Sequence, residues 1–520
     1  MKRREFCKGL VAALAAGAVA PGAAVQAVAA SASVGRAVPD GEYTFRYRSG
    51  RCAADLQHSW YYSDSLFDHA AQVYDNRLAL ATLGMTAAAF CTWDSDRQYW
   101  MNEEVGRADN IRDAFAQLGF AEVELIHYDH SLNDTPDTVA CAIARKTLVR
   151  KGSRVTIVAA FLRGSGYGAE WSGNLHAGPG SAHVGFTEAA REMAGQIQSY
   201  VRKSASRHAL GTLKFWMGGY SRSAAVANLV AARLPALLPK LAKKNTFVYT
   251  FATPASLAAA DCPDLQQDYD NNHTADGRLK KCWGSSNIFN IISSGDIVPR
   301  VLPWQWGFHR NGNDRFLPST VNAAELQALN ARSKQLDGDP LAFDQLAVAE
   351  DTDRVINAML ELFESRQNYY NVYEDAFRCM LQCACTRSEE EVTQGIVLDD
   401  DAVVARLRSM EEMQQFSLEK VQNCVQAASM MSRPMLERLD DTVPLMARQM
   451  VVPLLAVGLC FNVKTDALKL TLDFVLSMFA VEGQMNDTVR SVLCHYLENY
   501  VTLLEYYDPS DHCMEPYTRK

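Results

Sequence analysis

The chain has 520 residues, enough for one large domain with an accessory domain or for about three average domains. Its composition, 48% hydrophobic and 21% charged, is typical of a folded globular protein and argues against wholesale disorder and against many membrane spans. The formal net charge of -9 argues against a nucleic-acid-binding protein, because a phosphate backbone is held by clustered Lys and Arg side chains.

The first 32 residues are predicted to be a twin-arginine-type signal peptide. Lys2, Arg3 and Arg4 give a basic start, and an alanine-rich apolar stretch follows from Leu10 to Ala30. An uncleaved signal anchor is the alternative, and it is disfavoured because Ala, Pro and Gly insert weakly into a bilayer. We therefore expect a protein that is exported by the twin-arginine route and is secreted or associated with the cell envelope.

From residue 33 to residue 310 the pattern alternates between strands and helices. The predicted strands are 42–48, 123–128, 155–162, 213–217, 246–251 and 288–292, and the predicted helices are 78–90, 110–118, 138–148, 187–201 and 223–234. Strands that alternate with helices pair in parallel and are buried on both faces, which agrees with their unbroken apolar runs. This region is predicted to be an α/β domain with a mostly parallel sheet flanked by helices.

Beyond residue 311 the strands stop and the apolar period becomes helical, as in Val355, Met359 and Leu362. We predict a large all-helical insertion or cap at residues 311–505 and a C-terminal segment, 506–520, that returns to the core. Its most apolar stretch, 451–461, is too short to cross a bilayer.

The cysteines give no firm metal signal. Cys262 and Cys282 flank a polar loop and are the pair to test first for a disulfide. Cys379, Cys383 and Cys385 lie in an amphipathic helical pattern without a second half-site, so we expect core thiols with no ligand role. The sequence predicts no cofactor and no bound metal.

The strongest chemical signal is the run from Gly219 to Ser223, which reads Gly-Tyr-Ser-Arg-Ser between an apolar strand and an alanine-rich helix. A sharp strand-to-helix turn exposes a strained serine as a nucleophile, and small residues two positions either side avoid clashes. A plain helix N-cap serine is the alternative interpretation. The context predicts that Ser221 is a nucleophile.

A nucleophilic serine needs a base to take its proton, and the base needs an acid to orient it. In the strand-turn-helix architecture the acid and then the histidine follow the serine in the sequence. Asp296 lies in the loop after the predicted strand 288–292, which makes it the leading acid. The alternative is an ordinary turn aspartate.

These features resemble the class 3 lipase family, in the long form found in exported bacterial lipase-like proteins. The motifs that carry this resemblance are Phe161-Leu162-Arg163-Gly164-Ser165, Glu170-Trp171-Ser172-Gly173-Asn174-Leu175, His183-Val184-Gly185-Phe186, the Gly-Tyr-Ser-Arg-Ser run, Phe251-Ala252-Thr253-Pro254 and Asp296-Ile297-Val298-Pro299. It covers roughly residues 55 to 310 and the extreme C-terminus. The resemblance implies an α/β-hydrolase fold, hydrolysis of lipid or small acyl esters, and transient contact with a membrane or lipid surface.

The resemblance also assigns the oxyanion hole, which stabilises developing negative charge on the substrate. Ser165 matches the position that donates a hydrogen bond to the oxyanion in the family. His183 matches the histidine of a His-x-Gly-Phe motif, where the resemblance implies a structural role and not a catalytic one. On general grounds the backbone N–H of Arg222, next to the nucleophile, is the second donor.

Three histidines follow Asp296 in the sequence. His309 comes soon after the acid, and His495 lies in an apolar helical pattern, where a satisfied core residue is expected. His512 lies in a polar loop and resembles the family's late histidine, which is followed five residues later by a tyrosine, here Tyr517. Because a general base needs a free loop within reach of the serine, we predict His512 as the base, with His309 as the alternative.

Taken together, these features predict an exported serine hydrolase that cleaves carboxylic esters through an acyl-enzyme, with the helical insertion covering the nucleophile. Two alternatives stay open. One is a binding protein that kept the hydrolase fold without turnover, and the other is a serine hydrolase that acts on peptide or other acyl bonds.

Overall fold

The computed structural model describes residues 35–48, 55–90, 108–128, 137–164, 168–258, 286–338, 340–385, 398–436, 444–477 and 486–509. All of them belong to one unit, Val34–Lys520. The predicted signal peptide and the Cys262 and Cys282 pair lie outside the described residues, so both stay predictions.

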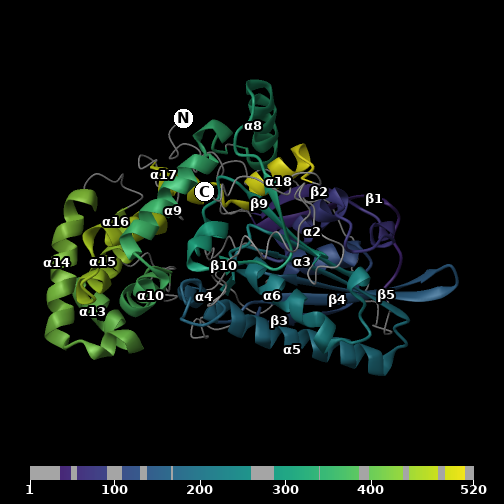
Figure 1. Cartoon of the computed structure of the whole chain (residues 1–520), viewed down its shortest axis with the longest axis horizontal. Helices are drawn as coiled ribbons and strands as arrows, with labels where there is room; N and C mark the ends of the chain where they lie inside the picture. The colour runs from purple at the N-terminus through teal and green to yellow at the C-terminus, as the bar shows by residue number, and fades with distance from the viewer. Residues whose placement is uncertain are drawn as a thin grey trace, which may run out of the picture. The chain divides into compact units, whose positions relative to one another are not determined.

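A seven-stranded sheet forms the centre of the molecule, with the strand order β11-β9-β7-β6-β5-β4-β3 (Figure 1). Its strands are β3 (Ala121–Ile126), β4 (Cys141–Arg150), β5 (Ser153–Leu162), β6 (Thr212–Tyr220), β7 (Thr246–Phe251), β9 (Ile288–Ser293) and β11 (Asn313–Leu317). The strands from β5 to β11 run parallel, whereas β3, β4 and β5 pair antiparallel. The predicted mostly parallel sheet is therefore confirmed. A separate hairpin joins β1 (Gly41–Arg48) to β2 (Asp55–Tyr62).

Two of the predicted elements are wrong. The helix predicted at 138–148 is the strand β4, and the strands do not stop at residue 311, because β11 pairs with β9. The run from Cys141 to Ala144 is apolar without a period of two, so it cannot be told from a buried helix by pattern alone. Its ten-residue pairing with β5 decides the outcome, since strand formation depends on tertiary contacts more than on local preference.

Alternate residues of the central strands face two different apolar layers. In β5, Val158 and Ala160 belong to the cluster formed with α5 (Val184–Arg207) and α6 (Arg222–Leu237). Ile157, Ala159 and Phe161 belong to the opposite cluster, which contains side chains of α2 (Asn76–Ala88) and α3 (Asp109–Gln117). This period of two fixes the three-layer architecture, with helices on both faces of the sheet.

Beyond β11, the regular secondary structure of the described residues is helical. Its α-helices are α8 (Ala323–Asp337), α9 (Ala349–Phe363), α10 (Arg366–Asn368), α11 (Glu374–Cys385), α13 (Asp400–Ser409), α14 (Leu418–Leu436), α15 (Pro444–Cys460), α16 (Thr465–Ser477), α17 (Asp487–Leu493) and α18 (Leu497–Tyr506). In Figure 1, α13 to α16 lie side by side. The helix α11 packs on α15. The predicted large helical addition is thus present, and none of the helices in the described ranges is long and apolar enough to cross a membrane.

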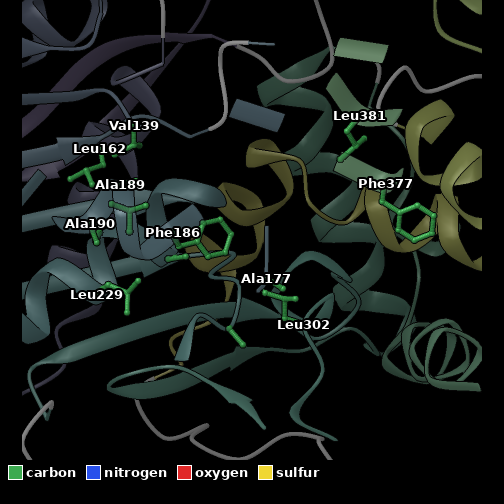
Figure 2. Packing of buried hydrophobic residues seen from close by; sticks show 14 of the residues in the cluster. Val139, Leu162, Ala177, Phe186, Ala189, Ala190, Leu229, Leu302, Phe377 and Leu381 are labelled. Atoms are coloured by element: carbon green, nitrogen blue, oxygen red, sulfur yellow. The ribbon is translucent and has the colours of Figure 1, made fainter. Parts of the chain in front are cut away.

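The helical region shares its apolar interior with the sheet. Figure 2 shows Phe186 and Ala189 of α5 and Phe377 and Leu381 of α11 among the side chains of one cluster (Figure 2). On the other face of the sheet, Tyr500 and other side chains of α18 join the cluster of α2 and α3. The last helix, α18, therefore docks on the sheet, and the turn that precedes it lies next to the strand ends.

Candidate active site

Ser221 occupies the turn between β6 and α6. Its backbone has φ 58 and ψ -129, a left-handed conformation that strains a residue with a side chain. A Cβ on Gly219 would lie 2.5 Å from the carbonyl oxygen of Ser223, so the close approach of strand and helix requires a residue without a side chain there. The Ser221 side chain makes no capping hydrogen bond to α6, unlike a plain N-cap serine.

The side chain of Ser223 stabilises the turn by hydrogen bonds to the backbone. Its Oγ accepts a hydrogen bond from the backbone N–H of Tyr220 at 2.9 Å and lies 2.9 Å from the carbonyl oxygen of Leu162, to which it donates. The backbone N–H of Ser221 donates to the carbonyl of Phe251 at 3.0 Å. The serine at the fifth position of the motif is therefore more than a small residue, because it ties the turn to β5.

Three side chains form a continuous relay at this turn. His495 Nε2 lies 2.8 Å from Ser221 Oγ, and His495 Nδ1 lies 2.8 Å from Asp296 Oδ2. An imidazole that donates from Nδ1 to the carboxylate presents Nε2 as an acceptor for the serine hydroxyl. The Asp296 side chain is fully buried and that of His495 is 18% exposed, so the relay runs from the interior towards the surface.

Asp296 is fixed by two further donors. The backbone N–H of Val298 donates to Oδ1 at 2.9 Å, and the Tyr500 hydroxyl donates to Oδ2 at 2.7 Å. The same hydroxyl accepts the backbone N–H of Ser293 at 3.0 Å. Burial, with the Asp296 charge beside it, raises the pKa of Tyr500 well above its usual value, so this residue stays a neutral donor. The carboxylate is thereby held in one orientation towards His495.

The turn that carries His495 is packed closely on the sheet. The Tyr220 hydroxyl donates to the backbone carbonyl of His495 at 2.7 Å, and the centroids of the two rings lie 5.4 Å apart. Tyr220 comes directly before Ser221, so one residue at the end of the strand positions the histidine of a distant turn.

The loop that carries Asp296 is packed equally closely. A Cβ on Gly295, the residue before the acid, would lie 2.1 Å from the carbonyl oxygen of Ala347.

The predicted oxyanion donors are only partly within the described residues. Ser165 lies outside them, whereas Arg222 is the first residue of α6, directly after Ser221. The Arg222 guanidinium is buried, which lowers its pKa, and it donates to the carbonyl of Thr138 and the side chain of Asn174, each at 3.0 Å. The arginine side chain thus anchors neighbouring loops, and only its backbone N–H is expected to face a reacting group.

A buried ion pair flanks the segment that contains Ser165. The guanidinium of Arg163 donates to the carboxylate of Glu170 at 2.9 Å, and both side chains are almost completely buried. This contact ties the end of β5 to the short helix α4 (Gly168–Gly173). The two sides of the predicted oxyanion segment are therefore held at a fixed separation.

The histidine of the relay is not the one that the sequence predicts. His512 lies outside the described residues, and His309 lies on the short strand β10 (Phe308–His309), where its Nδ1 faces the carbonyl of Gly307. The structure brings His495 to Ser221 and Asp296 instead. The expectation that His495 is a satisfied core residue is therefore wrong.

The prediction for His495 is wrong because the apolar residues around it belong to two short helices, α17 and α18, and not to one continuous helix. Leu493 and Leu497, which lie on either side of the turn, are buried, while His495 projects from the turn itself. One feature of the sequence indicates His495 as the base. The spacing of five residues between a histidine and a following tyrosine, which favoured His512, also occurs between His495 and Tyr500.

His183 has the structural role that the sequence indicates. Its Nδ1 accepts the backbone N–H of Phe186 at 3.2 Å, which caps the start of α5, and its Nε2 donates to the carbonyl of Asn174 at 3.0 Å. Burial lowers the pKa of this histidine to about 3. It is a neutral capping residue.

Comparison with protein families gives a match to one segment of the chain. Residues 161–306 match the family described as Lipase (class 3), and this segment contains both Ser221 and Asp296. The resemblance predicted from the motifs is therefore confirmed over this segment, and the match supports a carboxylic ester hydrolase. No curated protein matches the chain.

Among solved structures, the chain is similar to fungal lipases. It is 17% identical to a Rhizomucor miehei lipase in complex with its propeptide, with 47% of this chain and 70% of that chain covered and a TM-score of 0.30. It is 16% identical to lipase II from Rhizopus niveus, with coverage of 46% and 80% and a TM-score of 0.31. A triacylglycerol lipase described as having a serine protease triad is 20% identical, with coverage of 48% and 81% and a TM-score of 0.31.

Proposed function

We propose that this protein is an exported serine hydrolase that cleaves lipid-type carboxylic esters, with Ser221 as nucleophile, His495 as general base and Asp296 as the acid. The observation that carries the proposal is the pair of 2.8 Å contacts that link the three side chains at a strained strand-to-helix turn. A serine in such a turn, with a base in hydrogen-bond reach and a buried carboxylate behind the base, has the parts that acyl transfer needs.

In the proposed reaction, His495 Nε2 takes the proton of Ser221 as Oγ attacks the ester carbonyl carbon. The tetrahedral intermediate collapses when the imidazolium gives this proton to the leaving alkoxide, which departs as the alcohol. Water then attacks the acyl-enzyme, again with His495 as base, and the carboxylic acid leaves as Ser221 regains its proton. Asp296 stabilises the imidazolium in both steps without becoming protonated.

The negative charge of the intermediate requires donors that are already in place. We assign one to the backbone N–H of Arg222, because it follows the nucleophile at the start of a helix, where the helix dipole also favours negative charge. We assign the second to Ser165 on the family resemblance. The Arg163 and Glu170 ion pair would keep that segment in place during turnover.

The choice of lipid-type esters rests on the family match over residues 161–306. Such a substrate would bring the protein into transient contact with a membrane or lipid surface. The basic start of the chain, with Arg3 and Arg4 before an apolar stretch, supports export by the twin-arginine route. The proposed location is therefore outside the cytoplasm, either secreted or at the cell envelope.

Labelling with a fluorophosphonate, followed by peptide mapping, tests the nucleophile. We expect one label on the peptide that contains Ser221 and none in Ser221→Ala. Ser206→Ala is the matched control, because Ser206 is exposed on α5 and should leave labelling unchanged. A label that persists in Ser221→Ala would remove the assignment, and a folded wild type that takes no label would favour a binding protein.

Turnover of chromogenic esters of increasing acyl length tests the substrate class. We expect hydrolysis that rises from acetyl to medium-chain esters and disappears in Ser221→Ala. A labelled protein that cleaves peptide substrates in preference to esters would instead favour the peptide-hydrolase alternative. Export is tested separately by replacing Arg3 and Arg4 with lysine, which should leave the precursor in the cytoplasmic fraction.

A further inference from the structure

Three sulfur atoms converge in the helical region, and none of them belongs to the proposed relay. Cys379 and Cys383 lie one turn apart on α11, and Met410 lies at the end of α13. The Met410 Sδ is 3.1 Å from Cys383 Sγ and 3.9 Å from Cys379 Sγ, and the two thiols also interact with each other. The exposed fractions are 0% for Cys379, 1% for Cys383 and 8% for Met410, so the three side chains lie together in the protein interior.

From this geometry we propose that Cys379, Cys383 and Met410 form a binding site for a soft monovalent metal ion of the copper(I) class. Thiolate and thioether ligands select such ions, whereas carboxylate, carbonyl and water oxygens select magnesium, calcium and manganese. A thioether together with only two thiols also falls short of the four nitrogen, oxygen or sulfur ligands of a structural zinc site. The sequence predicts no ligand role for these cysteines, because their spacing does not associate Met410 with them, and the proposal departs from that prediction on the position of Met410.

The three sulfur atoms would be the corners of a trigonal site, and the two edges that meet at Met410 have nearly the length that a three-coordinate ion needs. If each metal-to-sulfur bond is about 2.3 Å, as for zinc and thiolates, the sulfur atoms around a trigonal ion are separated by about 4 Å. The Cys379 to Met410 edge, at 3.9 Å, already fits. The Cys383 to Met410 edge, at 3.1 Å, has to open by about 1 Å, which small rotations of the flexible methionine side chain can supply.

Binding changes protonation but no oxidation state. Each thiol that becomes a thiolate ligand releases one proton to the solvent, and the metal stays monovalent. A thioether carries no proton and binds without this exchange.

The site is tested by titrating the reduced, full-length protein with copper(I) in competition with a chromophoric copper(I) chelator. We expect the wild type to withdraw one more equivalent of copper than the Cys379→Ala/Cys383→Ala variant. Met410→Leu keeps both thiols and the core volume, and we expect at least a tenfold weaker affinity for that equivalent. Cys141→Ala, which removes a buried thiol of β4, is the matched control and should behave as the wild type.

Two results would overturn the site: an unchanged copper stoichiometry in the double cysteine variant, or a wild-type affinity in Met410→Leu. Circular dichroism confirms that each variant is folded before titration. A second measurement follows alkylation of Cys379 and Cys383 by mass spectrometry, and one equivalent of silver(I) should slow it at least tenfold in the wild type. Equal alkylation rates with and without silver would also refute the proposal, which does not depend on ester hydrolysis.

Discussion

Replacing Tyr500 by phenylalanine removes one hydroxyl and tests whether the orientation of Asp296 matters for catalysis. This hydroxyl donates to Asp296 at 2.7 Å and accepts the backbone N–H of Ser293 at 3.0 Å, in a fully buried position. A hydrogen bond to a charged group contributes roughly 1.5–3 kcal/mol. If the proposed transition state depends on that bond, kcat/KM falls by roughly 10- to 100-fold.

The loss should lie in kcat, with little change in KM. Tyr500 contacts the carboxylate behind the base and not the position of a substrate, so its removal affects an interaction that matters when His495 becomes charged. Steady-state kinetics with a chromogenic ester measure both constants. The hydroxyl thus acts as a positioning group for the relay.

Tyr249→Phe is the matched control for this change. Tyr249 is also fully buried, and its hydroxyl accepts the backbone N–H of Asp75 at 3.1 Å, so its removal deletes a buried hydrogen bond that is not part of the relay. Both variants should lose similar stability, while only Tyr500→Phe should lose kcat. A folded Tyr500→Phe with the kcat of the wild type, or an equal loss of kcat in Tyr249→Phe, would refute the reasoning.

Two further predictions concern the turn and the cap. Gly219→Ala places a Cβ about 2.5 Å from the carbonyl oxygen of Ser223, so the turn has to shift. We expect at least a 100-fold loss of esterase activity and a lower melting temperature, and wild-type values in both assays would contradict the tight turn. His183 is buried with a pKa of about 3, below its ordinary value of 6.5, so it adds stability above pH 6.5 that is lost as the pH falls towards 3. At pH 5 the titration of this one histidine lowers the free energy of unfolding by about 2 kcal/mol. The variant His183→Asn keeps a capping acceptor but has no titrating ring. In urea unfolding it should therefore lose about that much less stability than the wild type between pH 7 and pH 5. Equal losses in both proteins would contradict the neutral, buried state.

Local sequence was sufficient for the residues whose environment is set by their neighbours in the chain. The strand, turn and helix around Ser221 are consecutive, and small residues at Gly219 and Ser223 are required by contacts within the same turn. Asp296 follows β9 directly, so its place at the end of the sheet could be predicted from the strand pattern. These positions depend on contacts between residues that are close in the sequence, so they can be predicted from the local sequence.

The position of His495 depends on long-range packing and could not be predicted in that way. Its turn reaches Ser221 because α18 docks on the sheet and the Tyr220 hydroxyl donates to the backbone carbonyl of His495. An apolar pattern around a histidine is the same for a core residue and for a short turn between two buried helices. The convergence of Met410 with the cysteines of α11 has the same origin, since it joins separate helices.

Two histidine variants, compared under one condition, test the central claim most directly. The kcat/KM for a chromogenic ester should fall by at least 1,000-fold in His495→Ala and stay within about twofold of the wild type in His512→Ala, since removal of a triad member typically costs several powers of ten. Both variants should remain folded by circular dichroism. Wild-type activity in His495→Ala, together with a large loss in His512→Ala, would contradict the relay through His495 and return the role of base to the C-terminal segment.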